Sequence, residues 1–326
     1  MYSTTNHNAK TNKNPIGVPP TTPKAHQKAK GKKDLKQTIT DRIISLMEAG
    51  PESWQKTWKD AAAAGMPTNA ITNQPYKGIN VLVLWSHRIE QGFQSNKWMT
   101  YRQAKSVGAQ VRKGERSITC IYFQMVEKKK NKEGAEDKKE FFPLMRAFNL
   151  FNLDQIDNVP DELKDEIIGQ PKPDFDFNAK AEEFLQATGA KITHRGNRAF
   201  YRPSTDEIIL PQPEAFITPE NYYATACHEL THWTGHQRRL ARDFEGRFGD
   251  ESYAFEELVA ELGASFLCGH FGFIDATVEN HASYLSSWIK VLKNDKNAIF
   301  IAARHASNAY DYLLSTAGIT QKDNAA

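Results

Sequence analysis

Apolar residues along the chain settle into regular spacing only from about residue 35. The first regular stretch is a helical stripe that ends at Gly50-Pro51, and its apolar positions are Ile39, Ile43, Ile44 and Met47. Residues 81–88 form the next apolar run, which fits either a second helix or a strand. Two longer apolar runs, 118–126 and 141–150, flank the mixed-charge, Lys-rich residues 127–140. That arrangement predicts a β-hairpin with a long loop.

A strand pair is predicted in the second half of the chain. Short apolar runs at 198–201 and 207–210 flank the turn-rich sequence Pro203-Ser-Thr-Asp206. Two strands joined in this way leave an outer edge, and an extended peptide can bind to such an edge.

A helix is predicted at about residues 219–234. Thr218 and Pro219 are typical of an N-cap and a first helical residue, and Gly235 is typical of a helix end. Inside this helix the sequence reads His-Glu-Leu-Thr-His from His228 to His232. The motif therefore lies on a predicted helix, where its spacing has a structural meaning.

The spacing of this motif is that of a metal-binding helix. His228 and His232 are four residues apart and share one helical face, so both imidazoles can bind one divalent ion. Glu229 lies about 100° round the helix and would be the catalytic general base. The predicted chemistry is attack of a metal-activated water on a peptide carbonyl, with Zn²⁺ as the expected ion and Mn²⁺ as an alternative.

A catalytic site of this kind needs a third protein ligand, which leaves the fourth position open. Glu257 is the candidate, because Glu257 and Glu261 share one helical face while the opposite face is bulky, with Phe255, Leu258, Val259, Leu262 and Phe266. No Lys or Arg occurs from residue 248 to residue 289, so a metal would offset the burial of these carboxylates. We assign Glu257 as a ligand and Glu261 as a carboxylate that orients a metal-binding histidine.

Other residues compete for these roles. His236 continues the series of histidines, but Gly235 ends the helix before it. Glu256 lies one residue off the Glu257 face and is the weaker alternative ligand. Arg238 stands where a three-histidine motif would have its last histidine, which excludes that class. The sequence does not choose an oxyanion-stabilising residue, for which the candidates are Tyr253, Tyr284, His270, His281 and His305.

Composition narrows the class of protein. The 326 residues are 40% apolar and 25% charged, which is enough for two domains that each bury a core. The three cysteines, Cys120, Cys227 and Cys268, form no disulfide framework, and this fits a reducing compartment. No segment has the length and apolarity of a signal core or a membrane span. We therefore expect a cytoplasmic protein with no membrane partner.

The net charge of +3 conceals two halves of opposite sign. Residues 1–148 hold 26 Lys and Arg against 12 Asp and Glu, whereas residues 149–326 hold 16 against 27. Seven of the lysines lie in residues 1–33, which contain no acid and little apolar sequence, and this composition predicts a disordered tail. A basic half joined to an acidic half favours a polyanion-binding module joined to one that is not.

Aromatic and basic residues alternate along the basic half. Single-stranded nucleic acid is bound by this combination, because cations follow the backbone while rings stack on unpaired bases. Trp and Tyr are also frequent core residues, and that alternative stays open. The candidates for contact with single-stranded DNA are Lys56, Trp58, Tyr76, Lys77, Lys97, Trp98, Tyr101, Arg102, Arg112 and Lys113, with Trp54 as a further ring.

Several motifs together resemble the ArdC family of plasmid antirestriction proteins and the N-terminal part of TraC-type conjugative primases. They are Pro67-Thr-Asn69, Thr72-Asn-Gln-Pro-Tyr76-Lys-Gly78-Ile-Asn80, Trp98-Met-Thr-Tyr101, Gly108-Ala-Gln-Val-Arg112-Lys-Gly114-Glu115, His228-Glu-Leu-Thr-His232-Trp-Thr-Gly235 and Glu257-Leu-Val-Ala-Glu261. The resemblance spans about residues 35–315 and has motifs in both halves. It implies a single-stranded-DNA-binding domain followed by a zincin-like metallopeptidase domain that protects incoming plasmid DNA from host restriction enzymes. Glu257 corresponds to the glutamate ligand of zincins, and Glu261 replaces the aspartate usual four residues later.

The sequence therefore predicts an α+β protein of two domains. The expected parts are a basic tail at 1–34, a DNA-binding domain at 35–150, an acidic Pro-containing linker at 151–175, a zincin-like domain at 176–318 and a short tail at 319–326. The expected partners are single-stranded DNA and a protein substrate such as a host restriction enzyme. One alternative is a DNA-coating protein whose metal site is only structural or vestigial. A metal-dependent nuclease fits less well, because such sites gather carboxylates around hard cations.

Overall fold

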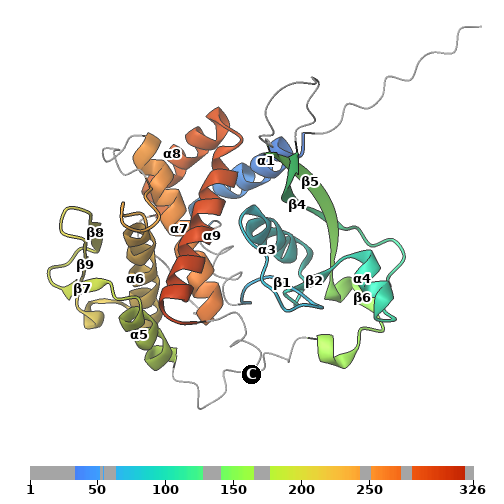
Figure 1. Cartoon of the computed structure of the whole chain (residues 1–326), viewed down its shortest axis with the longest axis horizontal. Coiled ribbons are helices and arrows are strands. Elements are labelled where there is room, and N and C mark those ends of the chain that lie inside the picture. Colours follow the sequence, from blue (N-terminus) through green and yellow to red (C-terminus); the bar gives the residue numbers. More distant parts are fainter. Residues whose placement is uncertain are drawn as a thin grey trace, which may run out of the picture. The chain divides into compact units, whose positions relative to one another are not determined.

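The structure is a computed structural model, and it describes residues 34–51, 54, 64–127, 141–164, 177–242, 251–272 and 281–319. The chain divides into two compact units, Met1–Asp34 and Leu35–Ala326, and the second unit holds the described elements (Figure 1). Both helices and sheets occur in this unit, so the α+β prediction is confirmed. Among the described residues no helix combines the length and apolarity needed to cross a membrane.

The N-terminal elements combine helices with a mixed sheet. The helices are α1 (Leu35–Glu48), α3 (Ile79–Gln91) and α4 (Tyr101–Ser106), and the strands are β1 (Thr68–Asn69), β2 (Lys97–Met99), β3 (Gln110–Val111), β4 (Ile118–Glu127), β5 (Phe141–Asn152) and β6 (Ile156–Asp157). Four strands form a sheet in the order β1-β2-β5-β4, and β3 pairs separately with β6. The predicted hairpin is confirmed, because β4 and β5 are antiparallel along ten residue pairs from Ile118↔Leu150 to Glu127↔Phe141. The apolar run at 81–88 is part of helix α3.

Helix α3 is joined to the outer edge of the sheet by one side chain. Asn80 donates from Nδ2 to the carbonyl oxygen of Ile121 at 2.7 Å and accepts the Ile121 backbone N–H at 2.9 Å. Because β4 is the last strand of its sheet, these backbone groups point away from β5. The amide of Asn80 thus makes the two hydrogen bonds that a further strand would otherwise make.

The C-terminal elements are a small sheet and a group of helices. The sheet has the order β7-β9-β8, with β7 at Lys191–His194, β8 at Phe200–Arg202 and β9 at Glu207–Leu210, and the helices are α5 (Phe177–Ala187), α6 (Pro219–Thr234), α7 (Glu251–Phe271), α8 (His281–Asn294) and α9 (Ala298–Thr316). β8 pairs antiparallel with β9 across a turn in which Asp206 has φ +50°, so the predicted strand pair is confirmed. The predicted helix at 219–234 has the same bounds as α6.

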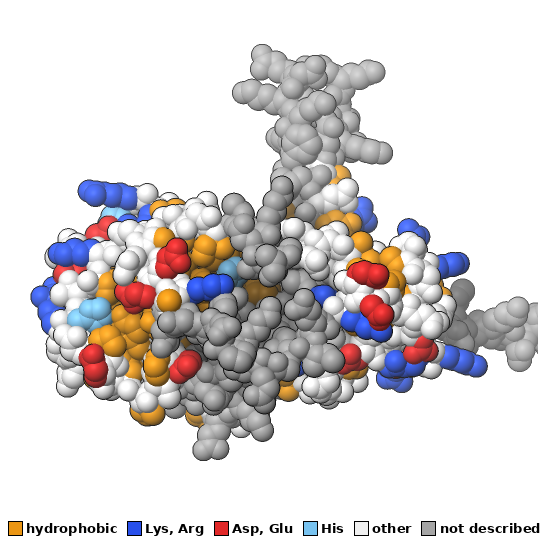
Figure 2. All heavy atoms as spheres, turned by 90° about the horizontal axis from the view of Figure 1, so that it is seen from below, with side chains coloured by type: hydrophobic (Ala, Val, Ile, Leu, Met, Phe, Trp, Pro, Cys, Tyr) orange, Lys and Arg blue, Asp and Glu red, His pale blue; other side chains and the backbone are white. Residues whose placement is uncertain are grey.

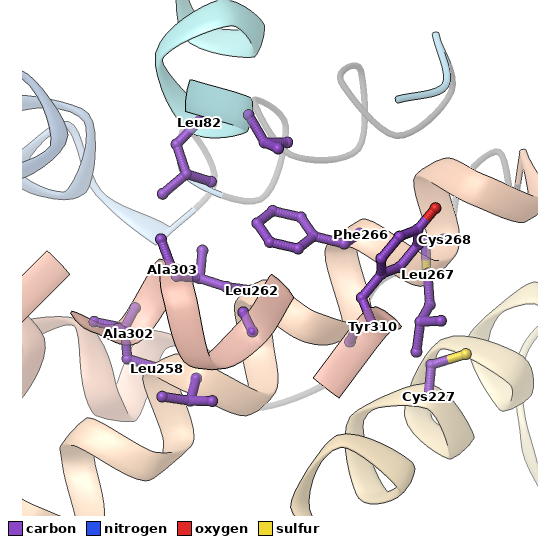
Figure 3. Packing of buried hydrophobic residues seen from close by; sticks show 14 of the residues in the cluster. Leu82, Cys227, Leu258, Leu262, Phe266, Leu267, Cys268, Ala302, Ala303 and Tyr310 are labelled. Carbon is purple, nitrogen blue, oxygen red and sulfur yellow. The ribbon is translucent and has the colours of Figure 1, made fainter. Parts of the chain in front are cut away.

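Helix α7 is the centre of the C-terminal core. The predicted bulky positions Leu258, Leu262 and Phe266 are fully buried, and Figure 3 shows them in one cluster with Ala302 and Ala303 of α9. On the side toward α6, Gly263 lies so close to Thr231 that a Cβ atom added to Gly263 would be 2.5 Å from the Thr231 Cγ2 atom. A glycine at this point lets α6 and α7 approach until their side chains can share one site.

The two halves of the Leu35–Ala326 unit share one hydrophobic cluster. The rings of Trp54 and Trp288 are 6.3 Å apart, and those of Trp85 and Phe266 are 5.9 Å apart. The Gly78 backbone N–H also donates to the Ser307 hydroxyl of α9 at 2.7 Å. The N-terminal elements are therefore packed on the C-terminal helices through apolar surface, which is costly to expose.

Paired strands also continue past the predicted end of the DNA-binding domain at residue 150. Asn152 of β5 lies opposite Trp98, and Ile156 of β6 lies opposite Val111. Residues 151–157 thus belong to the folded N-terminal domain and do not begin a linker. The remainder of the predicted linker lies largely outside the described residues, as do the tails.

Candidate metal centre

Helix α6 can be buried along most of its length because its polar side chains bond to its own backbone. Thr225, Thr231 and Thr234 donate their hydroxyl hydrogens to the carbonyls of Asn221, Cys227 and Thr231. At the start of the helix, Thr218 accepts the Asn221 N–H, and Pro219 occupies the first turn. These bonds leave the ring nitrogens of the two motif histidines to act elsewhere.

Three ligand atoms converge between α6 and α7. The Nε2 atom of His228 is 3.5 Å from one Glu257 carboxylate oxygen, and the Nε2 atom of His232 is 3.5 Å from the other. All three ligand atoms lie within 4.8 Å of one another. Two imidazole nitrogens and one carboxylate oxygen form the donor set of a zincin-type metal site, with a fourth position left for a small molecule.

The electrostatics of this group are those of a site that binds cations. Burial alone would raise the pKa of the Glu257 carboxyl, but the hydrogen bonds from His228 and His232 hold that pKa well below its usual range. The carboxylate is therefore charged and faces two imidazoles, which is the state that a divalent ion requires.

A buried carboxylate holds His232 from behind. Glu256 Oε1 lies 3.2 Å from His232 Nδ1, and a carboxylate can only accept, so Nδ1 carries the hydrogen of this bond. In the neutral imidazole that binds a metal, the lone pair is then on Nε2, the nitrogen that faces Glu257. The contact fixes both the ring orientation and the tautomer that a metal needs.

Arg242 balances the charge of Glu256. Its guanidinium donates to the Glu256 carboxylate at 2.8 Å and 3.0 Å, to Thr234 Oγ1 at 2.8 Å and to the Thr231 carbonyl at 2.5 Å. The side chains of Arg242 and Glu256 are 3% and 8% exposed, so the pair is held away from water. Arg242 comes from the segment after α6, and it joins the end of α6 to the start of α7.

These contacts revise the sequence-based view of the carboxylates. Glu256, expected only as an alternative ligand, supports His232, and the cation that balances it lies just before the Lys- and Arg-free stretch. Glu261 is buried one turn beyond Glu257, and its predicted role in orienting a histidine stays a prediction. His236 lies beyond the end of α6, where its Nδ1 accepts the Arg238 N–H at 3.2 Å.

Glu229 is placed for proton chemistry beside the three ligands. Its carboxyl is 6% exposed and accepts the backbone N–H of Tyr201 in β8. Burial raises the pKa of Glu229 above its usual range, against the opposing effect of the neighbouring His228 and His232. A carboxylate with a raised pKa is a better base than an exposed one, which suits a group that takes and returns a proton.

Two tyrosines lie next to the same group. The Tyr253 hydroxyl donates to Glu257 and is hydrogen-bonded to Tyr284, whose ring is stacked on Trp288 at 6.0 Å. His270 is elsewhere, with its Nδ1 2.8 Å from the Tyr310 hydroxyl, and His305 packs against Phe255. The side chain of the remaining candidate, His281, lies outside the described residues.

The edge strand β8 is anchored to the segment after α6. Arg239 stacks on the Trp233 ring at 3.8 Å and donates to Asp206 at 3.0 Å, and Tyr201 donates to the same carboxylate at 2.9 Å. Since Asp206 is in the β8–β9 turn, these bonds hold β8 in place beside Glu229. The edge that the sequence predicts for an extended peptide is thus tied to the helix that bears the motif.

The predicted DNA-contacting residues are distributed over different environments. Trp98 is wholly buried and packs on His87 and Phe93, so its assignment is corrected to a core residue; Trp54 is also buried. Tyr76 is largely buried, and its hydroxyl accepts from Asn69. Lys56 and Trp58 lie outside the described residues.

The basic candidates divide into paired and exposed ones. Lys77 pairs with Asp311 at 2.6 Å, Lys97 donates to the Lys164 carbonyl at 3.0 Å, and Arg112 pairs with Glu115 at 3.0 Å. Arg102 and Lys113 are exposed and form no ion pair among the described residues, and the ring of Tyr101 is 50% exposed. In the view of Figure 2, positive and negative side chains are interspersed over the described surface. On the face shown, charge alone therefore does not mark a DNA-binding surface.

Comparisons with known proteins match each half of the chain to a protein family. Residues 33–151 match the family described as the N-terminal domain of anti-restriction factor ArdC, and residues 179–305 match the zincin-like metallopeptidase family. Two Escherichia coli proteins named DNA primase TraC are 40% and 37% identical over 87% and 88% of this chain, which spans only 20% and 28% of their lengths. Uncharacterized protein y4eC of Sinorhizobium fredii is 34% identical over 86% of this chain and 91% of its own length.

Solved structures resemble the chain over most of its length. Crystal structures of the antirestriction protein ArdC from plasmid R388, one metal-free and one Mn(II)-bound, give TM-scores of 0.73 and 0.71 at 41% and 40% identity. Each match covers 87% of this chain and 98% of the other. With an ArdC N-terminal domain, a zincin-like domain and this structural likeness, the chain belongs to the ArdC family of antirestriction proteins.

Proposed function

We propose that this chain is a cytoplasmic, single-stranded-DNA-binding antirestriction protein of a conjugative plasmid, and that its zincin-like domain hydrolyses peptide bonds. The observation that carries the peptidase part is the convergence of His228, His232 and Glu257 beside a buried Glu229. A purely structural metal needs ligands and no general base. The combination of a ligand set with an adjacent base is that of a hydrolytic site.

The donor set fits a divalent ion. His228, His232 and Glu257 would hold it, with Zn²⁺ expected and Mn²⁺ as the alternative, and Glu261 would orient a histidine from outside the ligand set. A bound ion would polarise a peptide carbonyl and acidify water. A structural role for the ion is disfavoured, because the R388 relative has been solved in a metal-free form as well as a Mn(II)-bound form.

The chain's own groups would supply the remaining chemistry. Glu229 would take a proton from the attacking water and give it to the leaving amine. Tyr253 and Tyr284 would stabilise the developing negative charge on the carbonyl oxygen, since both lie beside Glu257. The β8 edge would hold an extended segment of the substrate, such as a host restriction enzyme, in line with Glu229.

The DNA-binding part is supported by the N-terminal family match and by the basic charge of residues 1–148. Tyr101, Arg102 and Lys113 remain candidate contacts because they are exposed. In this proposal, one domain binds the incoming single strand, and the other cleaves a host protein, such as a restriction enzyme, that would cut the DNA.

The test combines a transfer assay with metal analysis. Plasmid transfer into a restricting recipient is compared for the wild-type chain, Glu229→Gln and a matched control, Glu220→Gln, which removes a carboxylate from the first turn of the same helix. Loss of protection with Glu229→Gln alone, at unchanged metal content, supports hydrolysis. Full protection with Glu229→Gln and with a His228→Ala, His232→Ala double variant contradicts it and leaves DNA coating as the function.

A further inference from the structure

The β4–β5 hairpin extends beyond the sheet from which it grows. β2 pairs with β5 only at Phe151 and Asn152, whereas β4 follows β5 over ten residue pairs. Its inner positions Cys120 and Leu150 are buried in the core, but further out Tyr122, Phe123, Phe142 and Arg146 are exposed. The outer part is a two-stranded ribbon with side chains on two faces.

One face of this ribbon combines rings with a cation. Tyr122 lies directly opposite Arg146, and the Tyr122 ring is 5.9 Å from that of Phe148. Phe142 lies further out on the same face, opposite Val126. Tyr122 is 49% exposed and Phe142 is 43% exposed. We call this set, Tyr122, Phe142, Arg146 and Phe148, the Tyr122 face.

The other face also carries aromatic residues but no cation. Phe123 is 52% exposed and lies opposite Met145, and its neighbours on β5 include Ala147 and Asn149. No Lys or Arg occurs at the described positions of β4 and β5 that share this face. The Tyr122 face differs, because it carries Arg146 and none of its described positions carries a carboxylate.

From this difference we infer that single-stranded DNA stacks on the Tyr122 face of the hairpin, with Arg146 at a phosphate. The inference rests on the proposed DNA-binding function and names its site. Alternate residues of a strand are about 7 Å apart on one face, so Phe148 and Tyr122 are neighbours, and Phe142 lies two positions further out, beyond the Gln124–Leu144 pair. Unpaired bases can stack at both places. Among the described residues Arg146 makes no ion pair, and its guanidinium is exposed.

Cross-strand packing alone would explain some of these rings, because aromatic pairs stabilise a ribbon. It does not explain an exposed arginine between them, nor rings left half exposed to water. A duplex cannot use the row, since its bases are already stacked and paired. The Tyr122 face therefore favours single strands over duplex.

The test uses the full chain and a fluorescein-labelled thymidine oligonucleotide, with its duplex as the comparison. Tyr122→Ile keeps a residue that suits a strand and removes the ring. Phe123→Ile is the matched control on the next residue and the opposite face, and Arg146→Gln removes the charge. We expect Tyr122→Ile to weaken single-strand binding roughly 5- to 100-fold at unchanged duplex binding and melting temperature, and Phe123→Ile to change neither.

Photo-crosslinking to iodouracil-substituted single strands gives a second readout that needs no folded variant. Crosslinks on the peptide that carries Tyr122 or Phe148 support the site, and crosslinks confined to Tyr101 overturn it. Equal losses for Tyr122→Ile and Phe123→Ile also overturn it. Wild-type protein that binds no single strand removes the proposed DNA function as well, whereas binding that none of the hairpin variants changes removes only this site.

Discussion

At the scale of single residues, His232 depends on groups that the metal would never touch. Glu256 orders the ring through Nδ1, and Arg242 keeps Glu256 charged and in place. A buried ion pair of this kind is costly to break, because removing one partner leaves the other without compensation. The pair therefore determines how well the metal site is formed before an ion arrives.

Glu256→Ala is expected to lower the affinity for Zn²⁺ or Mn²⁺ about 10- to 100-fold, because His232 loses its orienting contact. Glu256→Gln should recover part of the loss, since its amide oxygen still accepts from Nδ1. Competition with a metal chelator measures the affinity. Glu183→Gln, on the exposed surface of α5, is the control for the loss of one carboxylate, and an equal effect there would contradict the assignment.

Arg242 shows why part of the site could not be predicted from the sequence. The His-Glu-x-x-His spacing alone led to His228, His232 and Glu229, and the small and bulky faces around Glu257 led to the third ligand. Arg242 lies in neither motif, and the separation between Arg242 and Glu256 is not a helical one. Such a pair is brought together by the packing of α6 against α7, which local spacing does not encode.

Two buried histidines make stability depend on pH. Burial lowers the pKa of His87 and of His270 to about 4, against an ordinary value of 6.5. Above pH 6.5 both states of the chain hold these rings neutral. As the pH falls from 6.5 toward 4, the unfolded chain takes up protons that the folded chain does not, so stability is lost across that window.

The melting temperature should therefore fall between pH 6.5 and pH 4. His87→Phe keeps a ring against Phe93 and Trp98 and should flatten this dependence. The control is His236→Asn, in the segment after α6, which should leave it as in the wild type. A His87→Phe variant with an unchanged slope would show that other groups cause the loss.

At the scale of elements, the site depends on the distance between α6 and α7. Gly263 faces Thr231, which stands between Glu229 and His232 on α6. A methyl group on Gly263 would overlap the Thr231 side chain, so the helices would have to separate at the point where their ligands converge. Thr231 also bonds to the Cys227 carbonyl, which limits its movement.

Gly263→Ala should cost about 1–3 kcal/mol of unfolding free energy and weaken metal binding. In the double variant Gly263→Ala, Thr231→Ala the clashing side-chain atoms are removed. Its metal affinity should therefore be higher than that of Gly263→Ala alone. Calorimetry and chelator competition measure the two effects. Unchanged metal affinity in the single variant would contradict the close-approach argument.

Elements with a clear local signal were predictable. Thr218, Pro219 and Gly235 marked both ends of α6, and the periodicity of two runs marked the β4–β5 hairpin. The apolar run at 81–88 could not be assigned to a helix or to a strand from its sequence, because a fully buried helix has no polar face. The β3–β6 pair was missed because strands of two residues carry no periodic signal.

At the scale of the whole molecule, the halves differ in charge but share a core. Trp85 against Phe266 and Trp54 against Trp288 join the N-terminal elements to the C-terminal helices. The charge asymmetry of the sequence favours a separable fragment of residues 1–150 that keeps most single-strand affinity. Because of the shared core, such a fragment exposes apolar surface, so the full chain is the better object for binding experiments.

Deleting residues 1–33 is expected to weaken binding to single strands and duplex alike, because it removes seven lysines and no ring of the Tyr122 face. The plot of log affinity against log salt concentration should become shallower by about 0.7 for each lost phosphate contact on a single strand. Fluorescence anisotropy at several salt concentrations measures it. A deletion that abolishes only single-strand preference would assign stacking to the tail instead.

The two hydrogen bonds between Asn80 and the Ile121 backbone affect whether other strands can pair with β4. An open strand edge recruits further strands, from a second copy of the chain or from an unfolding neighbour, and a hairpin with exposed rings is prone to such recruitment. By occupying the N–H and C=O groups of Ile121, one amide blocks the edge of β4 in the half that adjoins the core. The surface that we propose for single-stranded DNA thus adjoins an edge that is blocked to strands of protein.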